Sequence, residues 1–312
     1  TWFCEICLFS KKTAFFQFPF VFFCKICYNK IGELCKPCKN LPTSFIQVDS
    51  NEYNLNIISE RMRHFMRIRC KPWAKPELEA CPFYISDPKA CKGMWQAQFP
   101  KQQPLRLELG CGKGGFISQE ALANPDYNYI AVDIKNEMLV LAKRKLEAAY
   151  AAQQMPLDNV RVMIDNIMYL RECFAKEDRI DRIYINFCNP WPRGKHKKRR
   201  LTHPRQLVQY RMLLDGDIWF KTDDDELFEE SLEYFPEAGF RITTMTRDLH
   251  SEPELRYFET EHEQMFDEMG KKIKFLIAEP DPAVSEESLQ ELLQYSEKYS
   301  ERKRDNGLFH EE

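Results

Sequence analysis

Residues 105–116, LRLELGCGKGGF, decide the fold of this chain. The alternating run LRLEL (105–109) predicts a strand, and the residues after the glycines predict a helix. Between them, Gly110, Gly112 and Gly115 have the GxGxxG spacing that lets a backbone turn tightly and approach a ligand at a helix N-terminus. The stretch therefore predicts the ligand-binding strand–loop–helix unit of an α/β protein.

Strands and helices alternate along the rest of the chain. Further strands are predicted at 127–133, 160–164, 182–187, 217–222, 240–246 and 272–278, and helices at 116–123, 137–152, 203–214, 226–235 and 252–269. This alternation predicts a parallel sheet with right-handed crossovers, in which the final helix–strand pair offers an antiparallel edge. The fold class is therefore α/β, with a seven-stranded, mostly parallel sheet and helices on both faces.

Composition limits the classes of protein that remain. The 312 residues are 44% hydrophobic and 30% charged, which excludes a disordered or collagenous chain. Because 45 basic and 48 acidic residues nearly balance, any affinity for a polyanion must come from a local patch. No apolar run approaches the roughly 20 residues that span a bilayer. We expect a cytoplasmic protein that does not enter a membrane.

Cysteine spacing divides the chain. Six of the 12 cysteines lie in residues 1–38 as three CxxC pairs, whereas the others are scattered as expected for free thiols. Residues 1–65, rich in Cys and Phe, are expected to be upstream sequence that is not part of the native protein, which would start at Met66 or Met62. The alternative is a zinc-binding extension that uses Cys24, Cys27, Cys35 and Cys38. No other metal site is predicted.

The remaining chain is predicted to have three parts. Residues 66–103 contain many prolines and are expected to form a mostly irregular N-terminal arm. Residues 104–280 form the α/β domain, and residues 281–312 form a charged helical tail that lies in solvent.

Two ligands suit the glycine loop. Asp133 ends the next strand, where a carboxylate binds ribose hydroxyls. A Walker A loop is excluded, because Lys113 is followed by Gly114 instead of Ser or Thr. Glu108, just before the first glycine, would repel the pyrophosphate of NAD but suits the ammonium and sulfonium groups of S-adenosyl-L-methionine (SAM). Asn166, after the third strand, stands where an amide can bind an adenine amino group. The charge therefore favours SAM.

A basic run follows the fourth predicted strand. Residues 182–201 are RIYINFCNPWPRGKHKKRRL, and the strand ends at the carboxyl edge, where open α/β sheets bind ligands. No acidic residue occurs between 193 and 214, so positive charge gathers beside the predicted cofactor site. Such a patch indicates a polyanionic partner, and Trp191 offers a stacking surface for a base. The run therefore predicts a nucleic-acid substrate.

These motifs together resemble the tRNA (guanine-N7)-methyltransferase family of the bacterial single-chain type. The resemblance covers about residues 66–279, and its motifs are MRIRCKPW (66–73), ELGCGKGGF (108–116), NFCNPWPRGKHKKRRL (186–201), FKTD (220–223) and TEHE (260–263). It implies a Rossmann-like class I methyltransferase that transfers a methyl group from SAM to N7 of guanine 46 in the variable loop of tRNA. It also implies a monomer or homodimer without an obligate partner subunit.

The resemblance implies roles for individual residues. The cofactor-binding positions are Glu108, Gly110, Gly112, Asp133, Asn166 and Asn189. The substrate-binding positions are Arg193, Asp223, Thr260, Glu261, His262 and Glu263, and the RNA-binding run is Lys195, His196, Lys197, Lys198, Arg199 and Arg200.

Two positions depart from the family pattern, which commonly has Asp where this chain has Asn166 and Asn189. The second is the residue usually proposed as catalytic. Because guanine N7 carries a lone pair and no proton, its methylation needs no general base, and Asn189 can still orient cofactor or base. Asp223 or Glu263 is then expected to supply the missing negative charge, so Asn189 and Asp223 are the predicted catalytic residues.

Two rival functions remain. A dinucleotide-dependent oxidoreductase would share the glycine loop but would not need Glu108. A catalytically impaired relative would bind tRNA and SAM without forming product.

Overall fold

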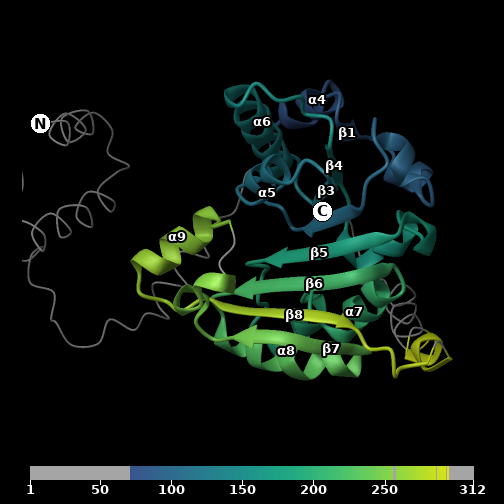
Figure 1. Ribbon diagram of the computed structural model, residues 1–312, viewed down its shortest axis with the longest axis vertical. Coiled ribbons are helices and arrows are strands. Elements are labelled where there is room, and N and C mark those ends of the chain that lie inside the picture. The colour runs from purple at the N-terminus through teal and green to yellow at the C-terminus, as the bar shows by residue number, and fades with distance from the viewer. Residues whose placement is uncertain (1–70, 256–257, 286, 293, 295–312) are drawn as a thin grey trace, which may run out of the picture. The chain divides into compact units, whose positions relative to one another are not determined.

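The computed structural model describes residues 71–255, 258–285, 287–292 and 294, and the thin grey trace in Figure 1 marks the rest. Within these residues lies an eight-stranded sheet with the order β1-β4-β3-β2-β5-β6-β8-β7. Its strands are β1 (Tyr84–Ile85), β2 (Leu105–Leu109), β3 (Asn128–Asp133), β4 (Val160–Ile164), β5 (Ile180–Asn186), β6 (Leu214–Thr222), β7 (Phe240–Thr246) and β8 (Lys274–Pro280).

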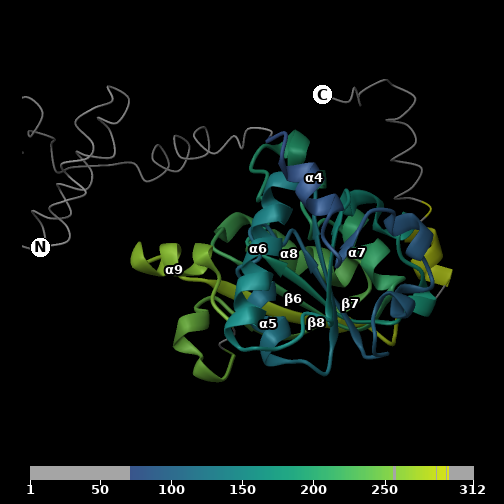
Figure 2. The ribbon, with the colours of Figure 1, turned by 90° about the horizontal axis from the view of Figure 1, so that it is seen from above.

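Helices cover both faces of the sheet, as predicted. The α-helices are α4 (Ala74–Glu79), α5 (Ile117–Ala123), α6 (Asn136–Ala152), α7 (Pro204–Arg211), α8 (Asp225–Glu237) and α9 (Glu261–Glu268). Short 3-10 helices are η3 (Pro88–Cys91), η4 (Trp95–Gln98), η5 (Ile167–Glu172), η6 (Lys176–Asp178), η7 (Gly194–Arg199), η8 (Leu249–Ser251) and η9 (Pro253–Leu255). Figure 2 shows α4, α5 and α6 on one side of the strands and α7 and α8 on the other.

The two hydrophobic cores alternate along the central strands, because successive strand residues point to opposite faces. Ile130 and Val132 of β3 belong to the core under α7 and α8, whereas Tyr129 and Ala131 belong to the core under α5 and α6. All residues of β2 are buried, as expected of a strand covered on both sides.

The sheet differs from the prediction at both edges. The predicted seven strands become eight, because Tyr84 and Ile85 pair in parallel with Val162 and Met163 of β4. Two residues are too short to give a recognisable sequence pattern. At the other edge, β8 is antiparallel to both β6 and β7 and lies between them, so the last strand in the chain is an inner one.

Two predicted helices are shorter than expected. The helix expected at 252–269 is interrupted: η9 precedes two undescribed residues, and α9 begins only after Thr260, whose side chain accepts from the Glu263 backbone N–H. The helix expected at 203–214 ends at Arg211, because Leu214 already belongs to β6.

The described part of the N-terminal arm consists of short helices and the two-residue β1 joined by turns, and it packs into the core. Trp95 is fully buried, stacks on Phe174 at 4.8 Å between ring centroids, and donates from Nε1 to the Cys173 carbonyl. The buried Asp178 carboxylate accepts from the backbone N–H groups of Gly93 and Trp95. These long-range contacts make the arm part of the core.

The first part of the tail buries one apolar side chain, whereas most of its described residues are exposed. Leu289 is 3% exposed, and Leu292 packs against the core under α8.

The predictions about residues 1–65, including the cysteine pairs, and about residues 295–312 fall outside the described residues. No helix among the described residues has the length and apolarity needed to cross a membrane. The five cysteines described (Cys81, Cys91, Cys111, Cys173 and Cys188) are free thiols, as predicted.

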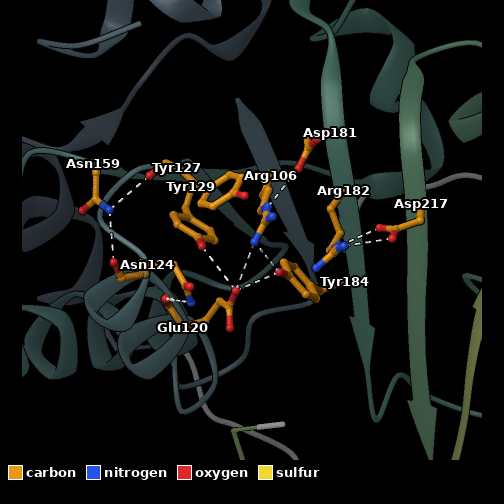
Figure 3. Close-up of polar contacts among 11 residues, drawn as sticks. Arg106, Glu120, Asn124, Tyr127, Tyr129, Asn159, Asp181, Arg182, Tyr184 and Asp217 are labelled. Carbon is orange, nitrogen blue, oxygen red and sulfur yellow. Dashed lines mark hydrogen bonds and ion pairs between the residues drawn. The ribbon is translucent and has the colours of Figure 1, made fainter. Parts of the chain in front are cut away.

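A buried polar network ties α5 to the central strands (Figure 3). The Glu120 carboxylate of α5 accepts from the Tyr184 hydroxyl at 2.8 Å, from Tyr129 at 3.3 Å and from Arg106 at 3.4 Å. Arg106 also donates to Asp181 at 3.0 Å. Because each buried charge has a partner of opposite sign, the network holds α5, and the loop that leads into it, against the sheet.

Candidate active site

The carboxyl ends of four neighbouring parallel strands, β4, β3, β2 and β5, meet at one edge of the sheet. Glu108 lies near the end of β2, Asp133 ends β3 and Asn186 ends β5, whereas Asn166 follows β4. The topology therefore brings together polar residues that are up to 78 positions apart in the chain. This edge is the candidate active site.

The glycine loop adopts the geometry that its sequence predicts. Gly110 and Gly112 have φ of 81° and 53°, a region that favours glycine. The Gly112 N–H donates to Asp133 Oδ2 at 3.0 Å, which joins the loop to the end of β3. The close approach lies at Gly114 and not at Gly115: a Cβ on Gly114 would lie 2.8 Å from Ala142 of α6.

Glu108 is a buried carboxylate with one unused oxygen. Its Oε1 accepts from Asn186 Nδ2 at 3.3 Å, whereas its Oε2 is buried without a hydrogen-bond partner among the described residues. Burial raises the pKa of Glu108 to about 8, although the Asn186 hydrogen bond and the charge of Lys221 favour the carboxylate. A buried acceptor of this kind suits a ligand that brings a cationic donor, so the residue fits the ammonium-bearing part of SAM.

Asp133, at the end of β3, and Asn166, after β4, are both half-buried. Asp133 accepts from Gly112 and from the Lys135 N–H at 2.9 Å, one bond on each oxygen, which leaves lone pairs for ribose hydroxyls. Burial raises the pKa of Asp133 despite these bonds. Asn166 caps η5, since its Oδ1 accepts from the Met168 N–H at 3.1 Å. Its Oδ1 keeps a second lone pair that can accept from an adenine amino group, and its Nδ2 can donate to a ring nitrogen.

The loop after β5 is strained around Asn189. Phe187 and Trp191 have φ of 50° and 43°, a conformation that costs a bulky residue about 1–3 kcal/mol. Asn189 is exposed between them, and its Oδ1 accepts from the Trp191 N–H at 3.1 Å. The amide therefore makes the local bond that an Asp carboxylate would make, so the departure from the family pattern leaves this turn intact.

Residues 193–200, called the basic segment below, divide into exposed and internally paired cations. Arg193, Lys195 and Arg199 are exposed, and the Arg199 guanidinium lies 5.1 Å from the Trp191 ring centroid. Arg200, however, is fully buried, which corrects the expectation that the entire run faces RNA. Lys197 is paired with two acids of α8. The positive charge of the basic segment is therefore partly neutralised, which the local sequence does not indicate.

The TEHE motif begins α9 next to this loop. Thr260 is the N-cap residue, and Glu261 is exposed and forms ion pairs with Lys145 and Lys113. The His262 ring lies 6.3 Å from the Phe187 ring, centroid to centroid, so α9 contacts the strained turn.

Glu263 is 1% exposed and is engaged by the protein itself, which corrects the expectation that it is available to guanine. Its Oε2 accepts from Lys221 at 2.7 Å, and its Oε1 lies 3.1 Å from His250 Nε2. Asp223 is less buried and pairs with Lys271 at 3.0 Å. Of the two acids expected to supply charge, Asp223 is the accessible one.

Several residues that build the site were not singled out from the sequence. Asn186, which donates to Glu108, and Lys221, which pairs with Glu263, both lie on strands. The sequence could have indicated the role of Lys221, because a lysine inside an otherwise apolar strand needs an acidic partner. Glu226 and Glu230 are an i,i+4 acid pair on α8 opposite the basic segment, and no local pattern relates them to it.

Comparisons with known proteins show what this chain is similar to. A family model described as "Putative methyltransferase" matches residues 102–276. A tRNA (guanine-N(7)-)-methyltransferase of Clostridium beijerinckii is 58% identical over 218 residues, which are 69% of this chain and 100% of that protein. A relative of the same name from Acetivibrio thermocellus is 54% identical over 216 residues, 69% of this chain and 99% of that protein. Among solved structures, the 16S rRNA methyltransferase KamB has a TM-score of 0.45 at 15% identity, covering 60% of this chain and 91% of that one.

The glycine loop, the edge carboxylates and the mostly parallel sheet define a Rossmann-like, SAM-dependent methyltransferase. SAM is its methyl donor, which excludes the dinucleotide-dependent oxidoreductase. Within this class, the chain belongs to the tRNA (guanine-N7)-methyltransferase family.

Proposed function

We propose that this enzyme methylates N7 of guanine 46 in the variable loop of tRNA by in-line displacement. The observation that carries the proposal is the buried, unpartnered Oε2 of Glu108 at a sheet edge that continues into an exposed basic segment. The first feature supports a cationic methyl donor and the second a polyanionic acceptor. The names of the relatives support tRNA and guanine N7.

The reaction needs placement more than proton transfer. SAM supplies a methyl group on a sulfonium; the sulfur–carbon bond breaks as the guanine N7 lone pair forms the new bond, so positive charge passes from sulfur to the purine. No proton leaves N7, so no general base is required. The protein therefore has to hold N7 in line with the breaking bond and to stabilise charge that appears on the base.

We assign the cofactor side to the sheet edge. Glu108 holds the amino-acid part of the donor, Asp133 the ribose and Asn166 the adenine. Gly110 and Gly112 allow the backbone to approach it. In this assignment the pKa of Glu108 falls when the cationic donor binds, because an opposite charge then offsets its burial.

We assign the acceptor side to the loop after β5 and its neighbours. Asn189 orients the guanine, and Asp223 stabilises the charge that develops on it, after its pairing with Lys271 loosens. Arg193, Thr260, Glu261 and His262 surround the base. The RNA backbone contacts Lys195, His196, Lys198 and Arg199 of the basic segment, and Trp191 stacks on the displaced base. Glu263 does not contact the base but holds α9 in place through its contacts with Lys221 and His250.

The test is methylation of unmodified tRNA by the full chain with SAM. Nucleosides from the digested tRNA are identified by mass spectrometry, and a tRNA with adenine in place of guanine 46 is the matched control. N7-methylguanosine in the first tRNA and none in the second is the expected result. Methylation at another guanine would contradict the position, and a different methylated nucleoside would contradict the acceptor atom. A parallel reaction with protein starting at Met66 tests whether residues 1–65 are dispensable, as we propose.

A further inference from the structure

Arg200 ends the basic segment but does not reach the protein surface. Its side chain is 0% exposed, whereas Arg193, Lys195 and Arg199 of the same segment are exposed. Arg200 Nε donates to the Pro190 carbonyl at 2.6 Å, and Nη1 donates to Glu230 Oε2 at 2.6 Å. A guanidinium buried among protein acceptors has no free face for a phosphate.

Helix α8 supplies the acids for this arrangement. Glu230 accepts from Arg200, from Lys197 and from the Tyr234 hydroxyl at 2.7 Å. Glu226, one turn earlier, lies 2.6 Å from Lys197 and 3.4 Å from Arg200. Because α8 packs on the sheet, it gives the Arg200 side chain a rigid support.

The Pro190 carbonyl is the point where this support meets the active site. Pro190 lies between Asn189 and Trp191, in the loop whose two positive-φ residues make it strained. Strained loops persist only when neighbouring contacts define them. Arg200 supplies such a contact, because its planar fork bridges the loop carbonyl and the α8 carboxylate at once.

We propose that the Arg200–Glu230 ion pair is a positioning device that holds the loop of Asn189 in its reactive geometry, and that Arg200 is not an RNA contact. The inference rests on the proposed function, since it concerns the loop that presents guanine to the methyl donor. It divides the basic segment into two roles: exposed cations bind the polyanion, and the buried arginine shapes the site.

Glu230→Gln tests the proposal without touching a cation. If the basic segment served only to bind RNA, removing an acid would leave kcat unchanged and tighten tRNA binding. The positioning role instead predicts a fall in kcat of about tenfold or more, whether or not the lost negative charge also tightens tRNA binding. A folded Glu230→Gln enzyme with wild-type kcat would overturn the proposal.

Arg200→Lys keeps the positive charge but loses the planar guanidinium group, which donates to two acceptors at once. An RNA contact of the phosphate type would tolerate this change, whereas a positioning role predicts that lysine does not restore kcat. The double variant Arg200→Met/Glu230→Met avoids an unpaired buried charge and so protects the fold. Its tRNA affinity is expected to keep the wild-type salt dependence, whereas Lys195→Met, the matched control, should lower the slope by roughly one unit. An equal drop in the double variant would show that Arg200 contacts RNA.

Loop geometry can also be followed without catalysis. Acrylamide quenching of Trp191, obtained by subtracting the signal of Trp191→Phe proteins, is expected to increase in Glu230→Gln. Suppose that the wild-type protein forms no N7-methylguanosine, but Trp191 quenching still increases in Glu230→Gln. That combination would refute the proposed function and leave the positioning role standing. Unchanged quenching in Glu230→Gln, with active wild-type enzyme, would refute the positioning role alone.

Discussion

Individual side chains in this protein acquire their chemistry from burial. Glu108 lies on a central strand and is 2% exposed, so its carboxylate loses most of its hydration. Asn186 satisfies one oxygen, and the other has no partner among the described residues. The cost of burying such a group is offset when a ligand supplies the missing hydrogen-bond donor.

Glu108→Gln is expected to stabilise the protein without ligand and to weaken SAM binding. The folded-state pKa of Glu108, about 8, exceeds its ordinary value of 4.5. The contribution of the neutral carboxyl group to the free energy of unfolding is therefore fully present below about pH 4.5. It is lost as the pH rises towards 8, by at most about 1.4 kcal/mol per pH unit.

Denaturant unfolding of both proteins without SAM, at about pH 5 and pH 8, measures this difference, and calorimetry measures SAM affinity. The variant should gain stability over wild type mainly at the higher pH. Wild-type affinity for SAM should rise with pH up to about 8, and this rise should vanish in Glu108→Gln. A variant less stable than wild type at the higher pH would contradict the assignment.

Asp223 and Asn189 are expected to contribute differently to turnover. Asn189→Asp should retain activity, since the amide oxygen already makes the bond to the Trp191 N–H that a carboxylate would make. Asp223→Ala should lose most activity, about a hundredfold in kcat, because the charge that offsets the developing purine cation is removed. Single-turnover methylation measures both, with the exposed Asp225→Ala as control. Wild-type turnover in Asp223→Ala would refute this division of roles.

At the scale of elements, α9 shows how a short helix is held in place. Its eight residues bury only Glu263, so its position depends on polar contacts more than on an apolar face. Lys221 of β6 donates to Glu263 and to the Phe258 carbonyl, and His250 bridges Glu263 and Asp267. Removing one member of a buried pair leaves an uncompensated charge, so such a helix is sensitive to single changes.

Lys221→Met is expected to destabilise the protein by about 3–5 kcal/mol, because it leaves the Glu263 carboxylate buried beside His250 alone. Lys221→Met/Glu263→Leu should recover most of that loss, since both charges are then absent. Thermal unfolding of the two variants measures the comparison. A double variant as unstable as the single one would show that the charge is not the cause.

Attachment of α9 is expected to weaken above neutral pH. Burial lowers the pKa of His250, but the hydrogen bonds to Asp267 and Glu263 outweigh it and raise the pKa above 6.5. The stabilisation is therefore fully present below about pH 6.5 and is lost as the pH rises through the folded-state pKa. Hydrogen exchange of α9 amides at about pH 6 and pH 8, corrected for intrinsic rates, should show less protection at the higher pH in wild type. His250→Asn should show low protection at both.

At the scale of the molecule, segments outside the predicted domain complete its core. The arm contributes β1 to the sheet and Trp95 to the core, and the tail contributes Leu289, whose side chain faces Gly239. These segments lack periodicity, because each buries one or two residues against elements that are distant in the sequence. The described arm and α/β domain are therefore expected to unfold together.

Trp95→Ala tests this expectation. Loss of the stacked, fully buried indole should cost about 3–5 kcal/mol and lower one cooperative transition. Met94→Ala, at an exposed neighbouring position, is the control and should change stability by less than about 0.5 kcal/mol. An early separate transition of the arm, with the main transition unchanged, would show that the arm folds independently.

The sequence alone determined the central strands, the glycine loop and the edge that carries Glu108, Asp133 and Asn189. These features depend on residue periodicity and short spacings, which act within one strand–loop–helix unit. Only the tertiary structure decided which charges are free. Arg200 and Lys197 look like RNA contacts in the sequence, but they pair with Glu226 and Glu230, about 30 positions later. Glu263 likewise looks available in TEHE, until Lys221 and His250 are found against it. Pairing of distant charges depends on how helices pack on the sheet, and no local pattern contains that information.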